Sequence, residues 1–143
     1  MSSIAVRPAA ERDFPAIARI QQTSPEAAQW PVGDYSGFEV LLALLHEGRT
    51  PVPAGFCAWR QTSADESELL NLAVAPEFRR RGVASALLRT LRNEAKGTIF
   101  LEVAEPNSAA ISLYDHHGWV STGVRKGYYQ NGMVDAIVMQ NCP

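Results

Sequence analysis

The chain has 143 residues, 46% of them hydrophobic, and a formal net charge of −2. This length and apolar content fit one globular domain with a sizeable core, so a single domain over residues 1–143 is expected. The slightly negative charge excludes a global basic field that would hold nucleic acid or an anionic membrane. A local cluster of arginines, at 79–81 with 89 and 92, fits a small anionic ligand better than a polyanion.

The first residues lack the basic and apolar regions of a secretory signal, and no stretch approaches about 18 consecutive apolar residues. The sequence therefore predicts a cytoplasmic protein. Cys57 and Cys142 are the two cysteines, and neither belongs to a CxxC pair or has a histidine at metal-binding spacing. Both are expected to be free thiols, and no metal site is expected.

The N-terminal part predicts a strand followed by two helices. Residues 4–6 are the strand candidate, and apolar residues at helical spacing over 14–20 predict a helix that ends before Pro25. A loop containing Trp30 follows, and its length indicates a functional surface. The apolar residues between 36 and 46 predict the second helix.

The remainder of the chain alternates strands with helices and closes on a pair of strands. Strands are expected at 52–60, 68–75, 98–104, 119–125 and 134–140, and helices at 82–96 and 107–117. The first two of these strands flank a polar turn and should form an antiparallel hairpin. The element order predicts an α+β or mixed α/β domain built around one sheet.

The segment LAVAPEFRRRGVASALL, residues 72–88, joins a strand to a helix through an arginine-rich loop. A helix N-terminus offers unpaired N–H groups to phosphate oxygens, and the small residues Gly82, Ala84 and Ser85 let a ligand approach the main chain. Each cation there opposes the helix dipole by roughly 0.3–1 kcal/mol, so a bound anion explains the cluster better than a solvated helix start. The loop lacks the GxxxxGK(S/T) and GxGxxG patterns, which disfavours ATP and NAD.

The run from Arg79 to Ala84 resembles the Q/R-x-x-G-x-G/A signature of the GNAT superfamily of acyl-CoA-dependent N-acetyltransferases. The element order resembles that family over nearly the whole chain. The resemblance implies a mixed central sheet flanked by about four helices, with acetyl-CoA as the co-substrate. It also implies a CoA site in which Leu72, Ala73 and Val74 meet the pantetheine arm, and in which the loop of Arg79, Arg80, Arg81, Gly82, Val83, Ala84 and Ser85 holds the pyrophosphate.

A second candidate site lies in LEVAEPNSAAISLY, residues 101–114. Strand alternation places Glu102 on the face opposite to its two neighbours, and a covered carboxylate is costly unless it is paired, hydrated or used. The chain advances about 13 Å from Glu102 to the turn, and a helix returning from Asn107 recovers about 10 Å. That path would bring Tyr114 level with Glu102.

Acetyl transfer needs a base for the amine and an acid for the departing thiolate, and Glu102 and Tyr114 are the candidates. Asn107 either caps its helix or bonds the CoA arm. Taken singly, an ion-paired strand glutamate, a core tyrosine and a capping asparagine are the simpler explanations of these three residues.

LEVAEPNSAAISLYDHHGW is similar to the pattern of the ribosomal-protein-alanine N-acetyltransferase (RimI type) branch, which has L-E-V, then N-x-x-A-x-x-L-Y. VRKGYYQNGMVDAIVM shares the R-x-x-Y-Y segment and the closing strand of that branch, whereas residues 24–35 follow it only loosely. The resemblance implies that Glu102 is the base and Tyr114 the acid. It also implies that Tyr128 and Tyr129 help to hold a peptide N-terminus, with packing at the rim as the alternative.

The function implied is acetylation of the α-amino group of a protein such as a ribosomal protein, at an N-terminal alanine. The same chemistry on a polyamine, an amino sugar or an amino acid is one alternative. A non-catalytic acyl-CoA-binding domain is another. The expected partners are acetyl-CoA and the acceptor amine, without nucleic acid or membrane.

Overall fold

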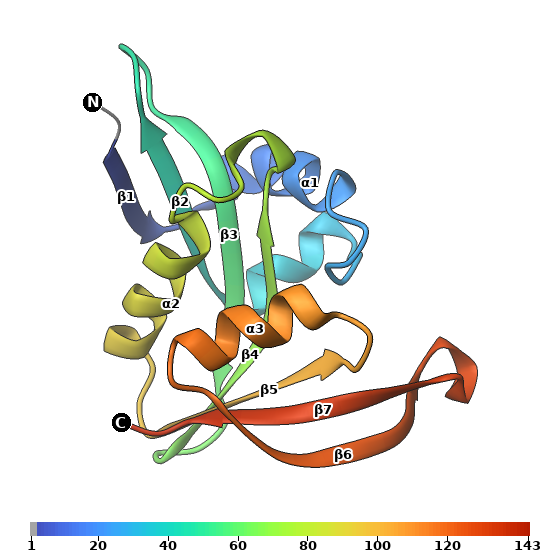
Figure 1. Cartoon of the computed structure of the whole chain (residues 1–143). Coiled ribbons are helices and arrows are strands. Elements are labelled where there is room, and N and C mark those ends of the chain that lie inside the picture. The colour runs from blue at the N-terminus through green and yellow to red at the C-terminus, as the bar shows by residue number, and fades with distance from the viewer. Residues whose placement is uncertain (1–2) are drawn as a thin grey trace. The chain divides into compact units, whose positions relative to one another are not determined.

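The computed structural model describes residues 3–143 and arranges seven strands in one sheet, in the order β1-β2-β3-β4-β5-β7-β6 (Figure 1). The sheet is mixed, because β4 and β5 pair in parallel whereas β5 with β7 and β7 with β6 pair antiparallel. The chain divides into two compact units, which are described separately below. No α-helix in the described residues has the length and apolar character of a membrane span.

The first unit combines the chain up to Arg60 with residues 69–94. Its strands are β1 (Ser3–Pro8), β2 (Glu39–His46), β3 (Val52–Gln61) and most of β4 (Glu66–Val74). Its helices are α1 (Phe14–Gln22) and α2 (Val83–Glu94), with short 3-10 segments η1 (Glu11–Asp13), η2 (Val32–Gly37) and η3 (Pro76–Phe78). The predicted helices at 14–20 and 82–96 are confirmed, and β3 and β4 are neighbours in the sheet as expected.

The predicted helix at 36–46 is wrong. Residues Val32–Gly37 form η2, and Glu39–His46 form β2, which pairs antiparallel with β1 on one side and β3 on the other. Leu41 and Leu42 point to opposite faces of the strand, yet both are buried. A strand covered on both faces is apolar at every position, so its hydrophobic residues also satisfy helical spacing.

The helices α1 and α2 cover the two faces of this strand. Ile17 of α1 packs with Leu42 and Phe56 in one core cluster. On the opposite face α2 contacts β1 and β2, and a Cβ added at Gly55 would come within 2.9 Å of a Val83 methyl group. The sheet of this unit is therefore enclosed by helices on both sides, which fixes the start of α2 against the core.

A buried hydrogen-bond network holds the loop that follows α1. Tyr35 donates its hydroxyl hydrogen to Gln21, and Asn71 of β4 donates to the Tyr35 oxygen at 3.0 Å. The Asn71 amide also pairs with both backbone groups of Ala28, at 3.1 and 3.0 Å, while Gln21 donates to the carbonyl of Trp30 at 2.8 Å. The loop that was long for a connector is thus anchored by internal polar groups, as buried polar atoms require.

The second unit combines residues 61–68 with 95–143. It contains the first residues of β4, then β5 (Thr98–Ala104), α3 (Ser108–His116), β6 (Val120–Tyr129), the 3-10 segment η4 (Gln130–Gly132) and β7 (Val134–Asn141). These elements confirm the predicted strands and the helix after Asn107. The fold therefore has three α-helices in the described residues, and the fourth helix that was expected is β2.

Gly97 offers a direct test of this second unit. Its φ is +71°, and a Cβ there would overlap the backbone carbonyl of Asp65, which accepts the Thr98 N–H at 2.9 Å. Gly97→Ala should lower the free energy of unfolding by about 1–3 kcal/mol, because both the left-handed backbone and the clash penalise a side chain. Gly48→Ala is the matched control, because a Cβ there meets nothing within 4 Å. Urea denaturation measures both, and equal unfolding midpoints for the two variants would contradict the assigned close approach.

Candidate active site

Glu102 lies in the middle of β5, on a face that strand pairing defines. Its Cα partner is Val138 of β7, and the partner of Val138 in β6 is Gly123. Directly opposed residues point to the same face of a sheet. The flanking Leu101 and Val103 are buried on the other face, whereas the Glu102 side chain keeps 21% of its surface exposed.

Arg125 of β6 is the ionic partner of Glu102. Its Nη1 lies 2.7 Å from Glu102 Oε1, and it reaches the carboxylate because its register partner is Ala136, two residues from Val138 and therefore on the same face. The hydrogen bond to Glu102 is the main cause that raises the pKa of Arg125. Glu102 Oε2, by contrast, is buried without a hydrogen-bond partner of standard geometry among residues 3–143.

The tyrosine pair predicted to hold a peptide lies beside this ion pair. The Tyr129 hydroxyl donates to the backbone carbonyl of Glu102 at 3.2 Å, and the rings of Tyr128 and Tyr129 meet edge to face at 4.8 Å. Hydrogen bonding toward the Glu102 carboxylate raises the pKa of Tyr128, with burial second, and burial raises the pKa of Tyr129 to about 12. Both hydroxyls therefore remain protonated donors at neutral pH.

A β-bulge in β6 sets the direction of these side chains. Arg125 opposes Ala136 and Tyr129 opposes Val134, so residues 126–128 face the single residue Asp135. Asp135 accepts the Gly127 N–H at 2.8 Å, the largest of the interactions that lower the pKa of its carboxyl group. Gly127 has φ +59°, which glycine adopts at little cost. Bulges redirect side chains where a strand would otherwise alternate regularly.

Tyr114 and Asn107 belong to α3. Tyr114 is the buried residue of that helix, and its ring packs 5.5 Å from the ring of Trp119. Asn107 is the N-cap, and its Oδ1 accepts the Ala110 N–H at 3.2 Å, so the capping alternative is confirmed. Its contact with a CoA arm and the acid role of Tyr114 stay predictions.

The predicted phosphate loop begins α2 in the other unit. Arg80 has φ +63° and Gly82 φ +86°, so two left-handed residues precede the helix. The first helical hydrogen bond runs from the Ala86 N–H to the Gly82 carbonyl at 3.0 Å. Alternating backbone conformations of this kind turn successive N–H groups toward one concavity, which suits an anion. Val83 is buried in the core, so only its backbone is available to a ligand.

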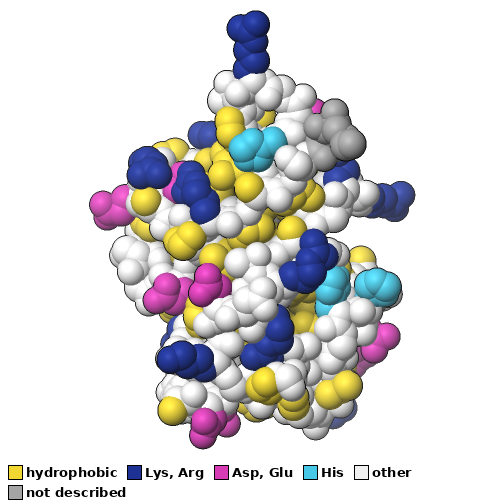
Figure 2. Space-filling view, turned by 90° about the vertical axis from the view of Figure 1, so that its left-hand side faces the viewer, with side chains coloured by type: hydrophobic (Ala, Val, Ile, Leu, Met, Phe, Trp, Pro, Cys, Tyr) yellow, Lys and Arg dark blue, Asp and Glu magenta, His cyan; other side chains and the backbone are white. Residues whose placement is uncertain are grey.

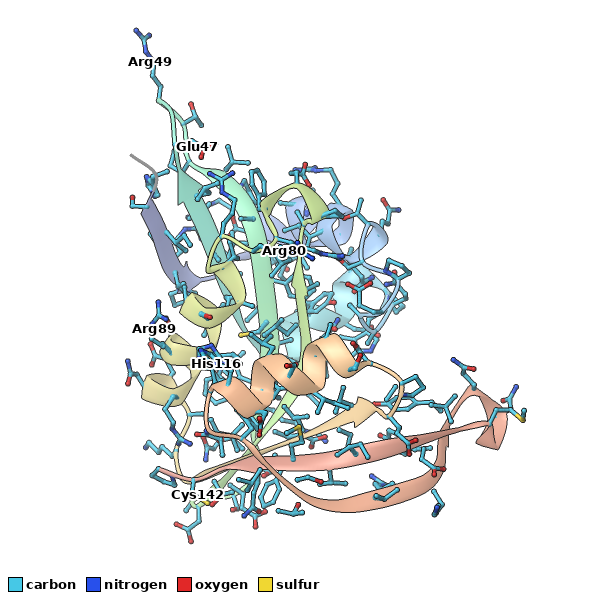
Figure 3. The ribbon with its side chains drawn as sticks, in the orientation of Figure 1. Glu47, Arg49, Arg80, Arg89, His116 and Cys142 are labelled. Carbon is cyan, nitrogen blue, oxygen red and sulfur yellow. The ribbon has the colours of Figure 1, made fainter. Side chains whose placement is uncertain are left out.

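Two of the three loop arginines already have carboxylate partners. Arg79 pairs with Glu26 at 2.7 Å and donates to the Val74 carbonyl at 3.2 Å, and Arg81 pairs with Glu47. Arg80 forms no ion pair with any residue of the described chain, and Figure 3 shows it at the loop before α2. Arg80 is therefore the one arginine of residues 79–81 without a carboxylate partner in the described chain, and the backbone conformation is the stronger indication of an anion site.

The remaining predicted cofactor residues lie on β4. Leu72 and Val74 are half-buried, and Ala73 between them is buried against the core. Cys57 and Cys142 are free thiols, as predicted. Figure 2 shows lysine and arginine side chains interspersed with acidic ones on the face in view, without a continuous basic surface. Within residues 3–143 no cluster of three metal-ligating side chains occurs.

Arg125 is the site residue that sequence reasoning missed. It begins the R-x-x-Y-Y segment, in which the family resemblance implies a role for the two tyrosines only. The pair joins residues 23 positions apart across an intervening strand, so nothing local in the sequence predicts it. The one available signal for the pair was that a carboxylate expected to be covered needs a cation, and Arg125 lies in another predicted strand.

Comparison with known proteins places these features in context. Residues 4–119 match the model of the acetyltransferase (GNAT) family. The ribosomal protein bS18-alanine N-acetyltransferase of Salmonella typhimurium is 36% identical over 137 residues, covering 89% of each chain. The Escherichia coli enzyme of that name is 40% identical over 85 residues, an alignment that spans only 57% of its length.

A solved structure extends the similarity to the whole chain. The crystal structure of the ribosomal-protein-S18-alanine N-acetyltransferase from Escherichia coli superposes with a TM-score of 0.82 at 28% identity, covering 98% of this chain and 94% of that one.

Arg80 tests the phosphate loop. Arg80→Gln should raise the dissociation constant for CoA about fivefold, because one exposed charge contact is worth roughly 1 kcal/mol, without lowering the thermal stability of the free protein. Arg89→Gln is the matched control, because Arg89 is an exposed arginine further along α2. Isothermal titration calorimetry with CoA compares the two, and equal effects would show that only net charge matters.

Proposed function

Because the chain belongs to the acetyltransferase (GNAT) family, we propose that it transfers the acetyl group of acetyl-CoA to the α-amino group of a protein N-terminus. The acceptor we propose is the N-terminal alanine of a ribosomal protein, as in the names of its relatives. The observation that carries the proposal is Glu102, whose Oε2 is buried without a hydrogen bond of standard geometry beside two protonated tyrosines. A buried polar atom without a partner is costly and is typical of functional sites.

The donor half of the reaction belongs to the α2 loop. We assign the CoA pyrophosphate to the backbone of residues 80–85 and the pantetheine arm to Leu72, Ala73 and Val74. Arg79 would act indirectly, by holding the loop in place, because its side chain donates to the Val74 carbonyl and pairs with Glu26. The family match spans residues 4–119, which draw on both compact units, and this supports one catalytic domain over 1–143.

The acceptor half belongs to Glu102 and Tyr114. An α-ammonium group has a pKa near 8 and must lose a proton before it can attack. Glu102 takes that proton, directly or through water, and the neutral amine adds to the thioester carbon. The C–S bond then breaks and Tyr114 protonates the departing sulfur. The second proton lost by the amine passes to Tyr114, which restores its hydroxyl, or to solvent. One proton is released overall for each amide formed.

The tyrosine pair is the reason for proposing a peptide as the acceptor. Tyr129 is fixed by its bond to the Glu102 carbonyl, while Tyr128 keeps 46% of its surface exposed and can contact an acceptor backbone. A ribosomal acceptor would place the reaction in the cytoplasm. A small amine as acceptor remains the second candidate, because the donor loop does not distinguish acceptors.

Glu102 and Tyr114 can be tested separately from CoA binding. Glu102→Gln and Tyr114→Phe should each lower kcat by roughly 10²–10⁴-fold, the usual range for loss of a general base or acid, with the dissociation constant for acetyl-CoA changed less than twofold. Steady-state kinetics on a peptide beginning with alanine, with CoA release as the signal, measures the effect.

The acceptor class is decided with the wild-type protein. Peptides differing in their first residue are compared with spermidine, glucosamine and free amino acids at equal concentration. A higher kcat/KM for the alanine peptide supports the proposal, and a preference for any small amine rejects it. Binding of acetyl-CoA without turnover of any amine would favour a non-catalytic domain.

A further inference from the structure

We propose that Arg125 is a positioning residue that holds Oε1 of Glu102, so that Oε2 is the oxygen that accepts the proton of the acceptor ammonium. This inference rests on the function proposed above. The proposed function assigns no role to Arg125. The inference gives it one, and it specifies which oxygen of Glu102 accepts the proton.

The two oxygens of Glu102 have different environments. Oε1 accepts the Arg125 Nη1–H at 2.7 Å, whereas Oε2 is buried and has no partner of standard geometry in the described chain. A guanidinium can bind a carboxylate through two parallel hydrogen bonds. Here it uses one, to Oε1, so Oε2 is the oxygen that the guanidinium does not engage.

Arg125 is itself held in place on its other side. Its Cζ atom lies 4.4 Å from the centre of the Tyr128 ring, a distance at which a cation is attracted to an aromatic face. The bulge at 126–128, anchored by the Gly127 bond to Asp135, places Tyr128 where this contact forms. The guanidinium therefore has a carboxylate at its end and an aromatic ring against its plane.

The charges around Arg125 suit holding rather than proton transfer. Its guanidinium stays protonated throughout the physiological range, and negative charge from Glu102 and Glu68 contributes to its raised pKa. The side chain is 55% exposed, and exposed ion pairs contribute little to stability. Compensating the charge of Glu102 needs only a nearby cation, whereas the single 2.7 Å bond to Oε1 also orients the carboxylate of the base.

The test compares Arg125→Gln with Arg125→Lys. Arg125→Gln should lower kcat about 10- to 100-fold, the scale of a misplaced catalytic group, while the KM for acetyl-CoA and the melting temperature stay close to wild type. Arg125→Lys should recover part of the loss, because it restores the charge without the planar fork. Lys96→Gln is the control: it removes an exposed cation of the same compact unit that lies outside the bulge, and it should leave kcat unchanged.

A double-mutant cycle with Glu102→Gln shows whether Arg125 acts through the carboxylate. Arg125→Gln should have no further effect on kcat in the Glu102→Gln background, because the group that it positions is then gone. Equal fold-losses in both backgrounds would overturn the inference, and so would a raised peptide KM with unchanged kcat. Full activity of Arg125→Gln with a slow Glu102→Gln would refute the positioning role alone. Full activity of Glu102→Gln would instead remove the proposed base and, with it, this inference.

Discussion

A carboxylate on a strand with buried neighbours is the constraint on which the candidate site depends. Glu102 lies between Leu101 and Val103, which are both buried, so its charge must be compensated by its own face of the sheet. The strand order β5-β7-β6 supplies that compensation, because β6 brings Arg125 across β7 to the carboxylate. The bulge, Asp135 and the tyrosine pair then follow as the parts that keep Arg125 and Tyr128 directed toward Glu102.

The same requirement for charge compensation applies to the arginines of the loop before α2, with a different result. Arg79 and Arg81 pair with Glu26 and Glu47, so their charges already have partners within the chain. What remains for an anion is the backbone, with left-handed residues at Arg80 and Gly82 before the helix. Helix N–H groups bind phosphate without side chains, so the anion site that we propose for this loop does not require free arginine side chains.

Strand β2 shows where local pattern fails. Residues 40–45 are apolar at every position, and that pattern satisfies both a helical and a doubly covered strand. The choice between them depends on α1 and α2 covering opposite faces of the sheet, which is information from distant parts of the chain. Strand β5, by contrast, was predicted with the bounds Thr98–Ala104 that the structure shows, because turn residues delimit it on both sides.

The sequence by itself determined the order of most elements, the capping role open to Asn107, the loop between β4 and α2 and the resemblance to one family. These depend on neighbours within a few residues, which local propensity and motif spacing report directly. Only the tertiary structure decided that β2 is a strand and that Arg79, Arg81 and Arg125 have carboxylate partners. The partners of these arginines lie 53, 34 and 23 positions away. Pairing over such distances is set by how strands and loops assemble, and no local pattern encodes it.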